Sequence, residues 1–437
     1  PPNAPVSVDA ARVGPWLSGA SNRRTLFLSS AEQCPKSMTR KSRTVALCCL
    51  ANFVNAADRV LMPIAIVPMS EQYRWSLLWQ GWILSAFAVG YITSQLVGSS
   101  APSRYGGRTV MAGAVLLWSA STLVTPLVAS SLPLLLLCRA LLGLGEGLGL
   151  PCMFHVVGQA APVPEERTRA VARVLAAGAA GQTAAALVCP HLEWHRAFYV
   201  LGALGIVWTA AWMLLHRDEP DGPQYKEPAK VNAVSSPHWL ELISHWPLWA
   251  IYIAHFAMNW SSYTIMQWLP TYLVRALSAG PGHLSLAALP YVCNSLCGLL
   301  TARAAELAGR QWSVLAVRRL ATSCLGLLGP GIGLLVFAAA GNLASALLVV
   351  SCAMGLLACN SAGHLANHAD VAPAHAALTF GVSNTLATIP GILCGPLTAE
   401  LVTQSHGRWF PVFVLAAAVN FVGAVVYGSQ SSAIQVL

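Results

Sequence analysis

Apolar stretches long enough to cross a bilayer alternate with short polar segments along most of the chain. A helix needs about 20 mainly apolar residues to span the hydrocarbon core. From residue 45 onward the sequence contains twelve such stretches. The predicted spans are residues 45–67, 77–98, 109–129, 133–156, 168–190, 196–215, 247–274, 284–303, 319–340, 343–365, 376–402 and 409–428. The pattern predicts an all-α membrane protein with twelve transmembrane helices.

The longest polar interruption separates the sixth span from the seventh and divides the predicted helices into two sets of six. We expect residues 1–43 to be a leader or disordered tail, 44–215 the first six-helix half, 216–246 a cytoplasmic linker and 247–430 the second half. Transporter bundles built from two repeated halves are organised in this way, with the substrate path between the halves. Small residues recur within the spans, as in AAGAAGQTAAA, and let helices pack closely in lipid.

Composition agrees with a membrane protein. Of 437 residues, 56% are hydrophobic and 9% are charged, against about 25% charged in soluble domains. The net charge of +9 does not indicate nucleic-acid binding, because the cations follow the loops. One set of alternate loops holds twelve basic residues and the other set four. The positive-inside rule then places both termini in the cytoplasm or its topological equivalent.

The first 43 residues are poor in acids and contain scattered Arg, Ser and Pro. Such leaders are typical of organellar transit sequences. A disordered cytoplasmic tail is the alternative, since polar segments of this kind cannot bury enough apolar surface to fold. Both interpretations stay open.

Sequence motifs of metal sites and enzymes are largely missing. Most of the twelve cysteines fall within spans, where they act as small apolar side chains and imply no disulfide framework. His364 and His368 are four residues apart but lack the acid of a zinc-protease motif. The chain also lacks a GxSxG motif and a nucleotide-binding loop. We expect no enzyme activity, no metal site and no cofactor.

Two arginines lie where a membrane span should be apolar. Arg59 falls in the first span and Arg139 in the fourth. An ionised side chain at bilayer depth costs about 2.5–3.5 kcal/mol on insertion scales and usually faces a water-filled path or a partner. A guanidinium group matches carboxylate or phosphate oxygens in a bidentate way, so both side chains are candidate ligands for an anion. The structural alternative is an ion pair, of Arg59 with an acid on a neighbouring helix and of Arg139 with Glu146.

Several longer segments resemble a known family. The loop RYGGR before the third span resembles the signature loop of the major facilitator superfamily. The further matching segments are NAADRVLMPIAIVPMSEQYRW (55–75), RALLGLGEGLGLPCM (139–153), SVLAVRRL (313–320) and NHADVAPAHAALTFGVSNTLATIPGI (367–392). They resemble the sodium/phosphate and organic anion transporter family of that superfamily. DRV in the first span and HFAMNW in the seventh look closest to its plant plastid branch.

The resemblance implies a fold, an activity and a location. The fold would be a monomeric twelve-helix major facilitator bundle. It would move inorganic phosphate or a small organic anion by alternating access, with Na⁺ or H⁺ as coupling ion. The membrane would be the plastid envelope or thylakoid, with another organelle or the plasma membrane as alternatives.

The resemblance also implies roles for matching residues. Arg59 and Arg139 would contact the substrate, and Glu146 would couple the cation, because burial favours the neutral form of a carboxyl group and so allows proton exchange. Asp58 is a weaker coupling candidate. Asn384 in span eleven would line the cavity or bond a neighbouring helix. The gating candidates are Arg104, Arg108, Asn367, His368 and Asp370, the last three of which we expect to act mainly as a polar cap between helices.

The chain departs from the family pattern at several polar positions. The acid of the signature loop is replaced by Ser103, and Leu84 and Met258 stand where relatives carry polar or charged side chains. These departures leave a rival open, a receptor or decayed carrier that kept the transporter fold without transport.

Overall fold

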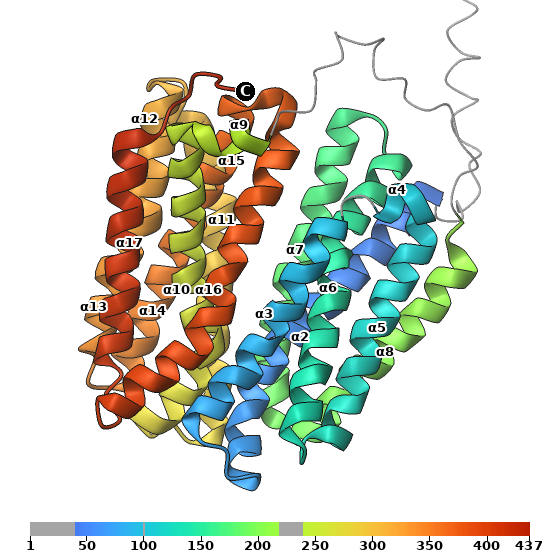
Figure 1. Cartoon of the computed structure of the whole chain (residues 1–437), viewed down its shortest axis with the longest axis vertical. Helices are drawn as coiled ribbons and strands as arrows, with labels where there is room; N and C mark the ends of the chain where they lie inside the picture. Colours follow the sequence, from blue (N-terminus) through green and yellow to red (C-terminus); the bar gives the residue numbers. More distant parts are fainter. Residues whose placement is uncertain (1–39, 99–100, 218–238) are drawn as a thin grey trace, which may run out of the picture. The chain divides into compact units, whose positions relative to one another are not determined.

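The computed structural model describes residues 40–98, 101–217 and 239–437, and these ranges contain no β-strand. Twelve membrane-length helical segments occur where the sequence predicts them (Figure 1). The first six are α2 (Arg40–Gln72), α3 (Leu77–Gly98), α5 (Gly107–Val128), α6 (Leu132–Ala160), α7 (Pro164–Val188) with η1 (Cys189–His191), and α8 (Trp194–Leu215). The leader up to residue 39 and residues 218–238 of the predicted linker lie outside the described residues.

The second six segments are less regular. Three of them are α10 (Trp246–Leu277), α16 (Ala376–Gln404), which η5 (Pro373–His375) precedes, and α17 (Phe410–Gln430). The eighth segment joins η2 (Pro281–Ala288) to α11 (Leu289–Ala308). The ninth is α12 (Val314–Arg319), the π-helix η3 (Leu320–Leu328) and α13 (Gly329–Ala338); the tenth is α14 (Leu343–Leu357), η4 (Ala358–Ser361) and α15 (His364–Val371). The sequence predicted these last two as single spans and missed their interruptions.

The composition of the helices confirms the predicted fold class. Within the described ranges, ten helical segments are long and apolar enough to cross a membrane. The other two long helices are α3 and α10, which contain polar side chains such as Gln80 in α3 and Asn259 and Gln267 in α10. Two short helices fall in predicted loops, α4 (Ala101–Tyr105) and α9 (Trp239–Ser244). The chain is an integral multi-pass membrane protein.

Buried apolar side chains divide residues 44–437 into three clusters. We call the side of the bundle where α2 begins and α17 ends the basic side; it is the upper end in Figure 1. The largest cluster lies toward the opposite side and contains residues of both halves, among them Met62 and Ile83 with Trp268 and Leu269. The other two clusters lie toward the basic side. One consists of side chains of α2, α3 and α5–α8, together with partly buried Ile392, and the other of side chains of the second half.

This distribution defines the conformation of the bundle. The two halves share one core toward the opposite side and have separate cores toward the basic side. Burial of shared apolar surface excludes water, so the opposite side is closed in this structure. In an alternating-access bundle this is the state whose substrate path leads toward the basic side.

Two glycines allow the halves to meet on the closed side. A Cβ atom at Gly81 of α3 would lie 2.5 Å from the carbonyl oxygen of Gly395 in α16, and a Cβ atom at Gly395 would lie 2.2 Å from that of Gly81. Small residues of this kind let backbones of neighbouring membrane helices approach closely. The contact therefore depends on both positions lacking a side chain.

We predict that Gly81→Ala destabilises the protein, by about 1–3 kcal/mol if the overpacking is typical. The measurement is the apparent Tm in detergent, compared with Gly113→Ala as the control. A Cβ atom at Gly113 of α5 meets no atom within 4 Å, so the control should be neutral or stabilised by up to about 1 kcal/mol through helix propensity. Equal Tm values for the two variants would contradict the close packing of α3 and α16.

Candidate functional site

An ion pair between α2 and α6 forms the centre of the candidate site. Nε of Arg59 donates to Oε2 of Glu146 at 2.7 Å. The side chain of Glu146 is fully buried, whereas that of Arg59 keeps 19% of its surface exposed. The sequence left open an ion pair of Arg59 with an acid on a neighbouring helix, and Glu146 is that acid. Part of the Arg59 side chain is thus still exposed, although its Nη2 is buried and has no hydrogen-bond partner among the described residues.

The glycine run around Glu146 explains how the two charges meet. Gly143 and Gly147 face α3, where added Cβ atoms would lie 2.0 Å from the carbonyl oxygen of Phe87 and 2.1 Å from Oγ of Ser94. Gly145 faces α5, where a Cβ atom would lie 2.9 Å from the carbonyl oxygen of Ala114. Since residues four apart share a helix face, the repeated glycines allow α6 to lie against two helices at once. This packing sets the depth at which Glu146 reaches α2.

Aromatic rings surround the guanidinium group of Arg59. Its Cζ atom lies 4.7 Å from the ring centroid of Tyr91 and 5.3 Å from that of Phe87. Cation–π contacts of this kind contribute about 0.5–2 kcal/mol, more when water is excluded. Tyr263 of α10 also interacts electrostatically with Arg59. Gly391 of α16 lies against the ring of Tyr263 and against Ala88 of α3. The site therefore lies where the two halves meet.

A second arginine and a second carboxylate lie deeper in the first half. Arg139 is 3% exposed and Asp58 is 1% exposed. Arg139 interacts electrostatically with both Glu146 and Asp58, and Oγ1 of Thr122 donates to Oδ2 of Asp58 at 3.2 Å. Two cations and two anions together leave this group of four without net charge. Nε and Nη1 of Arg139 are buried without a hydrogen-bond partner among the described residues, so Arg139 keeps donors that Glu146 does not occupy.

The other first-half residues proposed for gating contact their own half. The guanidinium group of Arg104 lies 5.4 Å from the ring centroid of Tyr105. Arg108 donates from Nη2 to the carbonyl oxygen of Met213 and accepts from Trp212 at 3.0 Å through its own carbonyl. Arg108 thus joins α5 to α8. A gating role for both residues stays a prediction.

Asn384 is half-buried on α16. It lies seven residues before Gly391, so both positions share a helix face and are about 10 Å apart along the axis. Gly391 contacts Tyr263 and Ala88 at the junction of the halves. This placement is compatible with a lining position on the basic side of Arg59, and substrate contact by Asn384 stays a prediction.

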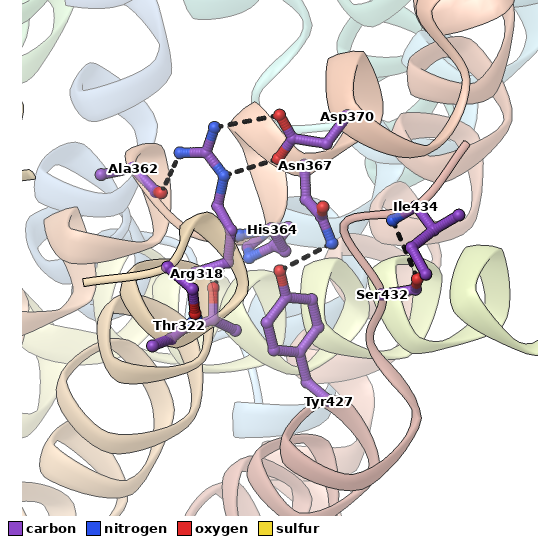
Figure 2. Close-up of polar contacts among 11 residues, drawn as sticks. Arg318, Thr322, Ala362, His364, Asn367, Asp370, Tyr427, Ser432 and Ile434 are labelled. Atoms are coloured by element: carbon purple, nitrogen blue, oxygen red, sulfur yellow. Dashed lines mark hydrogen bonds and ion pairs between the residues drawn. The ribbon is translucent and has the colours of Figure 1, made fainter. Parts of the chain in front are cut away.

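The three gating candidates of the second half lie on α15, and each bonds a side chain of another element; Asn367 and Asp370 are drawn in Figure 2. Arg318 donates to Asp370 through Nε at 2.7 Å and Nη2 at 3.3 Å, and to the carbonyl oxygen of Ala362 through Nη1 at 2.7 Å. Asn367 donates to Oη of Tyr427 at 3.0 Å. His368 bonds Thr379 at 3.0 Å. These bonds fit the expected role as a polar cap between helices.

Sequence reasoning missed the aromatic members of the site. Phe87 and Tyr91 are four residues apart on α3, and this spacing, which places two aromatic side chains on one helix face, was an available signal. Tyr263 had no comparable signal, because the packing of α10 against α16 and of α16 against α3 brings it to the junction of the halves.

Comparison with known proteins agrees with this architecture. The chain matches the Major Facilitator Superfamily over residues 48–394. It is 36% identical to sialin of Ovis aries, covering 82% of this chain and 76% of sialin. It is 31% identical to the sodium-dependent phosphate transport protein 1, chloroplastic, of Arabidopsis thaliana, covering 89% of this chain and 78% of that protein. A crystal structure of a bacterial homologue of the lysosomal transporter Spinster shares the fold with a TM-score of 0.73 at 17% identity, covering 91% of this chain and 99% of that one.

The buried ion pair generates a stability prediction. Glu146→Gln leaves Arg59 and Arg139 without their shared carboxylate, and removing one partner of a buried pair costs about 3–5 kcal/mol. Arg59→Gln in the same chain should restore part of this loss, so that the two effects are not additive in a double-mutant cycle of apparent Tm.

Glu193→Gln is the matched control, because Glu193 pairs with Arg196 at the surface, where both side chains are more than half exposed. Such a pair contributes less than about 1 kcal/mol. A loss for Glu146→Gln no larger than that for Glu193→Gln would show that the buried pair does not stabilise the fold.

Proposed function

The chain belongs to the major facilitator superfamily and to its anion transporter family, and on this premise we propose that it carries inorganic phosphate or a small organic anion by cation-coupled alternating access. Like its relatives, it is a secondary transporter of the membrane and not an enzyme. The substrate and the coupling ion, Na⁺ or H⁺, are the parts that belong to the proposal. We also propose that the carrier works as a monomer.

One observation carries the proposal: Arg59 is held by a buried acid, interacts with Tyr263 of the other half and keeps a terminal nitrogen without a partner among the described residues. Its Nε is engaged by Glu146, while Nη2 has no hydrogen-bond partner among the described residues. An incoming anion would accept a hydrogen bond from this unpaired Nη2. Phosphate is the first candidate, since one relative is a sodium-dependent phosphate transport protein.

Coupling follows from competition for the same guanidinium group. Glu146 and the anion are both negatively charged acceptors for Arg59. Neutralisation of Glu146 by a proton would weaken its bond to Arg59 and favour the anion, and loss of the proton would restore the pair and expel the anion. Arg139 and Asp58 would keep the neighbouring charge balanced during this exchange.

The plant relative also suggests in which membrane this chain works. That protein is chloroplastic, and we propose that this chain works in the plastid envelope or thylakoid membrane. A fluorescent fusion of the full-length product should colocalise with plastids, and a signal at the cell surface would contradict this location.

Arg59→Ala should reduce anion uptake by at least about tenfold in proteoliposomes, since a hydrogen bond to a charged group contributes about 1.5–3 kcal/mol. Arg59→Lys should recover only part of the uptake, because Lys keeps the charge and loses the bidentate fork. Arg310→Ala is the matched control: its side chain is 68% exposed and pairs only with Glu306 one turn away among the described contacts.

Uptake should be measured for phosphate, glutamate, sialate and ascorbate under separately imposed Na⁺ and pH gradients. The proposal expects one of these anions to accumulate under one of the two gradients. Unchanged uptake in Arg59→Ala would remove the binding assignment. Absence of flux for every anion, with the protein folded, would favour the receptor or decayed carrier.

A further inference from the structure

Three buried imidazoles meet in the second half of the bundle. His255 lies on α10, and His364 and His368 lie one turn apart on α15. None of the three residues is more than 3% exposed. The ring centroids of His255 and His364 are 5.3 Å apart, and the ring of Phe380 on α16 lies 5.9 Å from that of His255 and 5.7 Å from that of His368. We call these residues the three-histidine cluster.

The hydrogen bonds of Asn360 fix the tautomer of His364. Nδ2 of Asn360 donates to the carbonyl oxygens of Gly326 at 2.8 Å and Leu357 at 3.0 Å. Its Oδ1 therefore faces Nδ1 of His364, at 3.1 Å, and can only accept. Nδ1 of neutral His364 must carry the hydrogen, so Nε2 has a free lone pair. That Nε2 is buried without a hydrogen-bond partner among the described residues.

The same reasoning applies to His368. Oγ1 of Thr379 donates to the carbonyl oxygen of Ala376 at 3.1 Å, so it accepts from Nδ1 of His368 at 3.0 Å. Nε2 of His368 is then also a buried lone pair without a described partner. His255 bonds Oγ of Ser383 at 2.7 Å through Nδ1, where either group can donate. The cluster thus contains two buried nitrogen acceptors that are ready to take a proton.

Irregular backbone surrounds the cluster on two sides. The π-helix η3 contributes Thr322, whose Oγ1 accepts from the backbone N–H of His364 at 2.7 Å. The break between α14 and α15 falls at η4, just before His364. A Cβ atom at Gly363 would lie 1.8 Å from Oγ1 of Thr322. π-Helical turns and interrupted membrane helices are frequent at functional sites and rare elsewhere.

The charged groups around the cluster are already paired with each other. Asp370, on α15, is held by Arg318 of α12 in a two-bond contact. Tyr427 of α17 places its ring 6.4 Å from that of His364 and accepts from Asn367. From α16 the cluster meets Thr379, Phe380 and Ser383, which do not titrate. The electrostatic partners of His364 are therefore the other two histidines.

We infer that the three-histidine cluster is a proton-binding site, which accepts one proton on Nε2 of His364 or His368. Two positive charges about 5 Å apart would repel each other strongly in a buried setting, so the three imidazoles share a single proton. Among the described residues, no group of three or more His, Cys, Asp or Glu side chains is arranged to hold a metal ion. The inference rests on the proposed function in taking the proton as a coupling ion.

The position of the cluster provides a route to the anion site. His255 and Tyr263 lie eight residues apart on α10, and Ser383 and Gly391 lie eight residues apart on α16. Each pair spans about 12 Å of continuous helix. Charge on the cluster changes the forces between α10, α15 and α16 at one end. At the other end, Tyr263 and Gly391 touch each other beside Arg59.

Histidine NMR tests the site directly. Protein labelled at its histidine rings is placed in lipid nanodiscs and titrated with acid, and the cluster signals are assigned with His255→Gln, His364→Gln and His368→Gln. His283→Gln is the control, because His283 is exposed. We expect one protonation step that shifts all three cluster signals together. Three rings that stay neutral throughout the pH range of the folded protein, or that titrate independently, would overturn the inference.

Thr379→Val tests the cluster in case the histidine variants do not fold. It keeps all three imidazoles and removes the hydroxyl that accepts from His368, so it should move the shared protonation step to a different pH. An unchanged step would contradict the assigned network.

Transport separates this inference from the proposed function. His364→Gln should keep anion exchange at equal pH on both sides and reduce the stimulation by a pH gradient, since Glu146 and His368 remain, whereas Arg59→Ala should lose both. Full stimulation in a folded His364→Gln protein would overturn the coupling role. If the unmodified protein moved no anion, the proposed function would fail, and the NMR titration would still decide whether the cluster binds a proton.

Discussion

Charge buried between membrane helices must be compensated inside the protein, because lipid supplies neither water nor counterions. The bond between Arg59 and Glu146 meets this constraint, and much of the first half is arranged around it. Glycines in α6 bring the carboxylate against α2, aromatic rings of α3 cover the guanidinium group, and Arg139 and Asp58 bring the local charge to zero. A larger residue at Gly143 or Gly147 would separate α6 from α3 and so disturb the whole arrangement.

The two halves meet the constraint in different ways. The first half holds ionised groups in nearly continuous helices. The second half holds neutral imidazoles and has interrupted helices, with η3 and η4 bordering the cluster. A neutral histidine ring costs less to bury than an ion, but its nitrogens need hydrogen-bond partners. Interrupted helices free backbone groups for such bonds, which a regular helix would use internally. Sequence alone gives no reason to expect this asymmetry, since both halves are similarly apolar.

The sequence was a good guide to the helices and a partial guide to the site. Runs of about 20 apolar residues have few alternative structures in lipid, so all twelve segments occur where they were expected. Arg59 and Glu146 were identifiable because charges are rare in such runs. The sequence predicted an acid of a neighbouring helix as the alternative partner of Arg59, but it assigned Glu146 to Arg139, which lies on the same helix. The π-helix and the three-histidine cluster could not be predicted, because 109 residues separate His255 from His364 and only tertiary packing joins them.

The proposed binding role of Arg59 depends on the unequal burial of the two partners of its ion pair. Full burial of an ion pair carries a desolvation cost that can exceed its Coulombic gain, so partial exposure of one partner lowers that cost. Here Glu146 is fully buried and Arg59 is not. Arg59 interacts electrostatically with Tyr263 of the other half, so a movement between the halves would change the surroundings of the guanidinium group. The largest shared core lies toward the opposite side, and on the basic side Ile392 is the second-half residue that packs against the first-half cluster. Separation of the halves on the basic side would therefore expose less apolar surface than separation on the opposite side.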